Sequence, residues 1–338
     1  MSRIRCSLPE VWFTAAFLAL TLVTAEILGF RFHLPRGNSG ALVGIHYLYP
    51  LIGIAIWGLF ACIGQRRQLA RTFLVALPCY AIVLICHFNL KLWAPHINPV
   101  LWDGFYWQID NALRPLVDGC FALRKAMAVI VPLNSNFYMI AFIAMFYLSF
   151  CFHAVRDPHN FRTLFLAALI FQGIGGLAYL AMPALGPFIY EHGVDAKQMM
   201  TQHSMLNIYH ANLRGGADWI ATNGANDLTA GLAAMPSLHT GGSFLFLLFA
   251  WRHARVLTAL YVPLFGFIVI TAAATRWHYL IDLPMGIALA LCSAWIAERL
   301  NPRVGASPES PITADPDPVA AFLARLRLKA NILTQKIA

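Results

Sequence analysis

The stretch AAMPSLHTGGSFLFLLFAW, residues 233–251, places a proline, a serine and a histidine directly before an unbroken apolar segment. The stretch TRWHYLIDLPMGIALALCSAW, residues 275–295, repeats this arrangement with a histidine and an aspartate. Long apolar segments predict helices that cross a bilayer, because a helix satisfies its own backbone hydrogen bonds in lipid. The number of such segments therefore predicts how many helices cross the membrane.

The whole chain has the composition of a membrane protein. Of its 338 residues, 59% are hydrophobic and only 12% are charged, whereas a soluble domain carries about twice as much charge. The apolar blocks predict an all-α, polytopic membrane helix bundle with about eight transmembrane helices. The predicted spans are 11–30, 43–63, 72–90, 133–152, 164–185, 237–251, 257–275 and 279–298.

Residues 1–300 are expected to form a single transmembrane domain, and residues 301–338 a polar cytoplasmic tail. The stretch VAAFLARLRLKANIL, residues 319–333, fits an amphipathic helix on the membrane surface. Two segments between spans, 91–132 and 186–236, are predicted as long polar or mixed loops. Asp103 and Asp110 lie in the first of them and are expected to be solvated.

Arginines cluster in the segments 65–71, 153–162 and 252–255, which fall on one side if eight spans alternate. Short loops rich in Lys and Arg face the cytoplasm, so the stretches 233–242 and 275–284 are expected at the external side. The same clustering explains the net charge of +9 without nucleic-acid binding. The seven cysteines form no CxxC pair and are predicted to be packing residues.

The first stretch has the features of an anion site. Pro236 fits the first turn of a helix, where its missing N–H costs nothing. The free backbone N–H groups of a first turn attract anions, and the Ser237 hydroxyl adds a further donor. The sequence therefore predicts that Ser237 contacts a bound phosphate.

The second stretch supplies an acid–base pair. His278 and Asp282 are four residues apart, so a helix would stack them on one face. A carboxylate there holds an imidazole in one tautomer. Together with His239 and the positive charge of Arg276, the pair can attack a phosphoester, stabilise its charge and protonate the leaving group.

Three other interpretations of these residues are open. Each histidine can be a polar residue at the membrane interface without a catalytic function. His239, His278 and Asp282 can bind zinc, although no HExxH motif supports a metal site. Glu26 lies inside the first predicted span, and an intramembrane carboxylate is typical of a transporter or carrier.

AMPSLHTGGSF (234–244) and WHYLIDLPMG (277–286) together resemble the type 2 phosphatidic acid phosphatase superfamily. They are most similar to its inositol phosphorylceramide synthase-like branch, as is MPALGPF (182–188). The resemblance implies a six-helix phosphatase-type core and a phosphohistidine intermediate. It implies that His278 attacks phosphorus, that Asp282 orients His278 and that His239 protonates the leaving group. It also implies that neither a metal nor another cofactor is required.

The chain departs from the superfamily pattern at its cationic positions. The first motif of the family is a lysine, six residues and Arg-Pro, but Trp107 stands at the lysine position before Arg114. Ala272 stands where the third motif has an arginine, and we expect Arg276 to substitute for it. Arg214 is a further candidate for phosphate binding on the external side.

The sequence thus predicts an integral membrane enzyme, in a bacterial inner membrane, with its active site facing the external side. Its expected partner is a membrane lipid whose phosphoester is cleaved, or transferred to a second alcohol acceptor. The enzyme is expected to be a metal-independent phosphatase or phosphotransferase. A membrane transporter or carrier without phosphoester chemistry is the alternative function.

Overall fold

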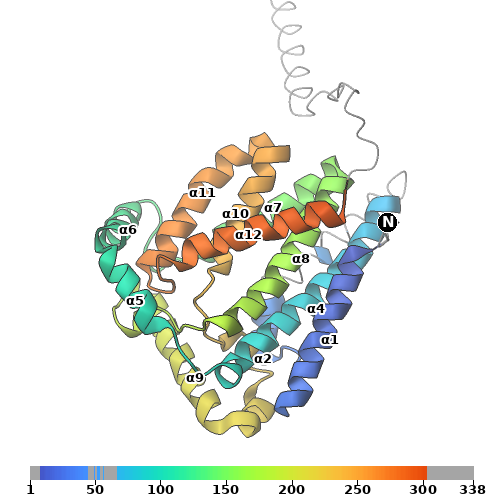
Figure 1. The fold of residues 1–338 in the computed structure, drawn as a ribbon. Helices are drawn as coiled ribbons and strands as arrows, with labels where there is room; N and C mark the ends of the chain where they lie inside the picture. The colour runs from blue at the N-terminus through green and yellow to red at the C-terminus, as the bar shows by residue number, and fades with distance from the viewer. Residues whose placement is uncertain (1–7, 45–48, 50–51, 54–55, 57–66, 303–338) are drawn as a thin grey trace, which may run out of the picture. The chain divides into compact units, whose positions relative to one another are not determined.

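A computed structural model describes residues 8–44, 49, 52–53, 56 and 67–302, together with the side chains of all but 67–74 among them. These residues form helices and turns and contain no strand (Figure 1). The predicted all-α fold is therefore confirmed for this part of the chain. The chain divides after Asn301, and all that follows concerns the first unit. The predicted surface helix, 319–333, lies outside the described residues.

Six helices in the described part of the chain are long and apolar enough to cross a membrane. They are α1 (Pro9–Leu28), the stretch Val75–Ile97 of α4 (Arg67–Ile97), α7 (Phe137–Arg156), α8 (Pro158–Ala181), α11 (Arg255–Ala274) and α12 (Asp282–Leu300). These helices make the chain an integral membrane protein with a polytopic helical bundle.

Two of the eight predicted spans are not among these six helices. The predicted span 43–63 lies mostly outside the described residues. The predicted span 237–251 is helix α10 (Leu238–His253), which has 16 residues. At 1.5 Å per residue it is about 24 Å long, shorter than the hydrocarbon core of about 30 Å.

The prediction of long loops at 91–132 and 186–236 is wrong. Helix α4 continues to Ile97, and the rest of both segments is largely helical. The elements there are α5 (Asp103–Ala112), α6 (Arg114–Met127), η2 (Pro187–Ile189), α9 (Ala196–Asn223) and η3 (Leu228–Ala230), and a short α2 (Gly37–Val43) follows α1. These helices are polar or amphipathic, so a search for continuous apolar runs does not detect them.

The two motif stretches are brought together by the packing of α10 against α12. Gly241 of α10 lies against the Gly286 carbonyl oxygen of α12, and Gly286 lies against the Ser237 carbonyl oxygen. A Cβ atom at either glycine would collide with backbone. Glycine at both positions therefore allows the two helices to approach at their N-termini.

Contacts between helix termini show which turns lie at the same end of the bundle. Arg162 at the start of α8 forms an ion pair with Glu10 at the start of α1 (3.0 Å). Asn301 donates a hydrogen bond to the start of α8, and Glu298 pairs with Arg252 beside the α10–α11 turn (2.6 Å). The basic α7–α8 and α10–α11 turns therefore lie at the same end, as predicted from the sequence. The N-termini of α10 and α12 lie at the other end, near α5, α6 and α9 (Figure 1).

Candidate active site

Helix α10 begins at Leu238, and its first turn keeps free backbone N–H groups. Ser237 is the N-cap, but its hydroxyl donates to the Thr240 hydroxyl (3.1 Å) and caps no backbone N–H. The prediction that Pro236 occupies the first helical turn is wrong, because Pro236 precedes the cap. The N–H groups of Leu238, His239 and Thr240 still point out of the helix start, where they attract anions.

His278 and Asp282 lie together, but not through the predicted helical stacking. His278 is in the turn between α11 and α12, and Asp282 is the first residue of α12. The Asp282 carboxylate reaches back and accepts the Tyr279 N–H (2.8 Å), which folds the turn. The His278 Nδ1 atom then lies 3.4 Å from the Asp282 Oδ2 atom.

The tautomer of His278 follows from a main-chain contact. Its Nδ1 atom is 2.8 Å from the Ala234 carbonyl oxygen, which is closer than the Asp282 carboxylate. A carbonyl oxygen can only accept a hydrogen bond, so Nδ1 carries the proton. The Nε2 atom of the neutral ring is therefore bare and can act as a nucleophile.

His239, in the first turn of α10, is held by aromatic rings from α7. Its ring lies edge-on to Tyr138 and Phe142, with centroid distances of 5.5 and 4.8 Å. The Ser237 N–H donates to the Asp282 carbonyl oxygen (3.0 Å), so the start of α10 lies against the start of α12. The structure thus brings both predicted histidines, Asp282 and the start of α10 to one place.

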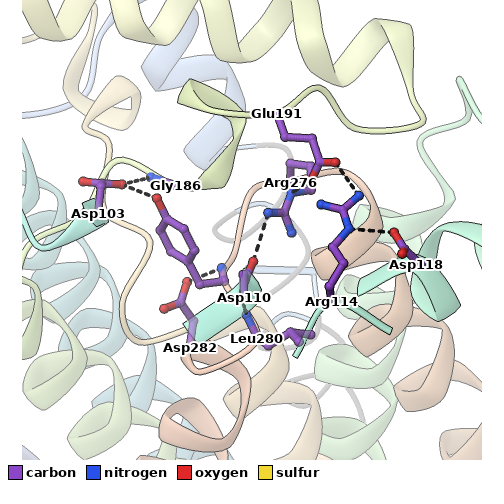
Figure 2. Close-up of polar contacts among 10 residues, drawn as sticks. Asp103, Asp110, Arg114, Asp118, Gly186, Glu191, Arg276, Leu280 and Asp282 are labelled. Carbon is purple, nitrogen blue, oxygen red and sulfur yellow. Dashed lines mark hydrogen bonds and ion pairs between the residues drawn. The ribbon is translucent and has the colours of Figure 1, made fainter. Parts of the chain in front are cut away.

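Arg276, two residues before His278, is fully buried. Figure 2 shows its guanidinium beside Asp110 and Glu191. Its guanidinium forms ion pairs with Asp110 (2.9 Å) and Glu191 (3.3 Å). It also lies 5.5 Å from the centre of the Trp107 ring, so the residue at the lysine position of the first motif covers this arginine. The Arg276 backbone is left-handed (φ 60°), a conformation that costs a non-glycine residue about 1–2 kcal/mol.

Glu191 joins the two candidate arginines. Arg114 donates to Glu191 (2.6 Å) and to Asp118 (2.8 Å), and the hydrogen bond to Glu191 raises the pKa of Arg114. Arg114 and Arg276 therefore face the same carboxylate (Figure 2). Arg214 is exposed on α9 and has no described contact with the other candidate residues.

The prediction that Asp103 and Asp110 are solvated is wrong, because both carboxylates are buried. Asp103 accepts the Tyr279 hydroxyl (2.8 Å) and the N–H groups of Leu185 and Gly186. Asp110 accepts the Leu280 N–H (2.9 Å). Burial raises the pKa of both carboxyl groups, and these hydrogen bonds lower it in part.

These two aspartates position the turn that carries His278. They hold Tyr279 and Leu280, the two residues that follow it. Their spacing in the sequence could have indicated this role. Asp103 and Asp110 are seven residues apart, which places them on one face of a helix. Within the described part of the chain, no group of three or more His, Cys, Asp or Glu residues is arranged to hold a metal ion.

A family model of the PAP2 superfamily matches residues 107–296, more than half of the chain. The chain belongs to the PAP2 superfamily. The matched region runs from Trp107 on α5 to helix α12 and contains both histidines and Asp282. The predicted resemblance is confirmed at the level of the superfamily, and the protein has a membrane phosphatase-type function. No curated protein and no solved structure matches the chain.

Proposed function

We propose that this PAP2 protein cleaves or transfers a lipid phosphoester through a phosphohistidine on His278. The observation that carries this proposal is the 2.8 Å contact between His278 Nδ1 and the Ala234 carbonyl oxygen. This contact leaves Nε2 bare, as a nucleophile requires. His239, in the first turn of α10, is proposed as the acid for the leaving group.

The proposed reaction has two steps. In the first, His278 Nε2 forms a bond to phosphorus, the ester P–O bond breaks, and protonated His239 gives its proton to the leaving oxygen. In the second, His239 takes a proton from water or an alcohol, whose oxygen attacks phosphorus and releases His278. Water as acceptor gives a phosphatase, and an alcohol gives a phosphotransferase.

The surroundings of His278 fit the charges that develop in these steps. The phosphorylated ring with a proton on Nδ1 is a cation, and the Asp282 carboxylate lies 3.4 Å from that nitrogen. The free N–H groups at the start of α10 are proposed to face the phosphate oxygens. The Ser237 hydroxyl already donates to the Thr240 hydroxyl, and its contact with phosphate stays a prediction. Phosphate binding by Arg114, Arg276 and Arg214 stays a prediction; the first two already share Glu191.

The substrate is proposed to be a membrane lipid whose phosphate lies at the external face of a bacterial inner membrane. This fits a site at the end of the bundle opposite the basic turns. PSLH and MPALGPF resemble the inositol phosphorylceramide synthase-like branch, so transfer to an alcohol is proposed alongside hydrolysis. Helix α9 lies at the same end of the bundle as the site and is proposed to contribute to acceptor selection (Figure 1).

The direct test is turnover by the purified protein in detergent micelles. We expect phosphate release from a lipid phosphoester, or transfer to an added alcohol, at a rate that EDTA does not change. The reason is that His239 and His278 supply the acid and the nucleophile. Loss of the rate in EDTA, with recovery on adding zinc or magnesium, would contradict the proposal. Absence of turnover, together with solute transport in vesicles, would favour a carrier.

The proposed orientation predicts which thiols an impermeant reagent can reach. In a cysteine-free background, Asp218→Cys on α9 should be labelled from outside intact cells. Arg255→Cys, at the start of α11 beside the α10–α11 turn, should be labelled only after the cells are opened, because basic turns face the cytoplasm. Both side chains are exposed, so burial does not decide the result. The reverse pattern would overturn the external site.

A further inference from the structure

Helix α4 carries a lysine within its membrane-spanning stretch. Lys91 lies six residues before the end of the apolar stretch Val75–Ile97, about 9 Å along the helix axis. Its side chain is half-buried, and no ion pair joins it to a carboxylate among the residues that the structure describes. A charge inside a membrane span is costly, and such a residue is normally functional.

The residues around Lys91 belong to segments that lead to the candidate active site. Its ammonium group lies over the ring of Tyr179 in α8, 5.4 Å from the ring centre. Gly231, five residues before Pro236, packs against the Lys91 backbone carbonyl. Leu238, the residue before His239, packs against Gly175, which is one helical turn before Tyr179 on α8. Helices α4, α8 and the start of α10 therefore meet around this ammonium group.

The other cations near the histidines are already neutralised. Arg276 is paired with Asp110 and Glu191, and Arg114 is paired with Glu191 and Asp118. A phosphate monoester brings up to two negative charges into the site, and these need a cation that is not already paired. Lys91 has no carboxylate partner among the described residues, and its ammonium group lies over Tyr179 beside the start of α10.

We propose that Lys91 is a substrate-binding residue whose ammonium group pairs with the phosphate of the lipid at His239 and His278. The pairing brings a positive charge from α4 to a site whose other groups come from α10 and the α11–α12 turn. It also explains why an uncompensated lysine stands within a membrane-spanning stretch. The proposal rests on the proposed phosphoester function, and inorganic phosphate tests the binding step separately from turnover.

The experiment compares Lys91→Met, which removes the charge but keeps the length, with Lys91→Arg, which keeps the charge. Lys125→Met on α6 is the matched control, because Lys125 is exposed. Thermal unfolding in detergent is measured with inorganic phosphate and with chloride at equal ionic strength, and KM and kcat are measured on the lipid substrate. Should Lys91→Met give no monodisperse protein, Lys91→Gln takes its place.

Phosphate should raise the Tm of the wild type, Lys125→Met, Lys91→Arg and His278→Ala, because a ligand stabilises the state that binds it. Lys91→Met should lose this shift, and its KM should rise by about 10- to 100-fold, as expected for a lost charged hydrogen bond. A Lys91→Met variant with the wild-type phosphate shift and KM overturns the proposal, as does a wild type without any shift. If the shift depends on Lys91 but turnover survives in His278→Ala, the proposed function fails and the Lys91 site stands.

Discussion

The variant His278→Ala is expected to lose turnover of a lipid phosphoester by about 10⁴–10⁶-fold, the range for removal of a catalytic nucleophile. Its bare Nε2 atom is the only proposed source of the bond to phosphorus, so the covalent intermediate should also disappear. Rapid quench with ³²P-labelled substrate, followed by gel analysis under alkaline conditions, measures the adduct. The wild type should show a labelled band that acid removes.

The control for this variant is His210→Ala, which removes an exposed histidine of α9. It should keep wild-type turnover and the labelled band. Equal circular dichroism and elution volume of both variants will show that the fold is intact. A labelled adduct that persists in His278→Ala would assign the nucleophile to another residue.

Hydropathy predicted the helices that are apolar along their whole length. The predicted span 257–275 differs from α11 (Arg255–Ala274) by two residues at its start and one at its end. Helices α5, α6 and α9 were missed because their polar faces interrupt the apolar runs. The predicted third span, 72–90, ends one residue before Lys91, whereas α4 continues to Ile97 and includes this lysine.

The pairing of His278 with Asp282 was predictable, but its geometry was not. A spacing of four residues suggests a helix, whereas here a turn folded by the Asp282 carboxylate joins them. The shortest contact of His278 is the carbonyl oxygen of Ala234, 44 positions earlier in the chain. Any residue presents a carbonyl oxygen, so no sequence motif reveals this partner.

His239 differs from His278 in the side chains that surround it. His278 is fixed through Nδ1 by a carbonyl oxygen and a carboxylate. His239 is instead held between two aromatic rings of α7, and no described hydrogen bond fixes either ring nitrogen. A ring without a fixed acceptor can give up its proton and take one back, as an acid–base group does in two successive steps.

The variant His239→Ala is therefore expected to show a loss that depends on the leaving group. With a lipid ester, whose alkoxide must be protonated to depart, turnover should fall by about 10²–10⁴-fold, the usual range for general acid catalysis. With a p-nitrophenyl phosphate ester, whose leaving group needs little protonation, the loss should be much smaller. Initial rates on both substrates measure the difference, and His278→Ala, which should lose both activities, is the control. Equal losses of His239→Ala on the two substrates would remove the acid role from His239, because a residue that only binds phosphate affects both substrates alike.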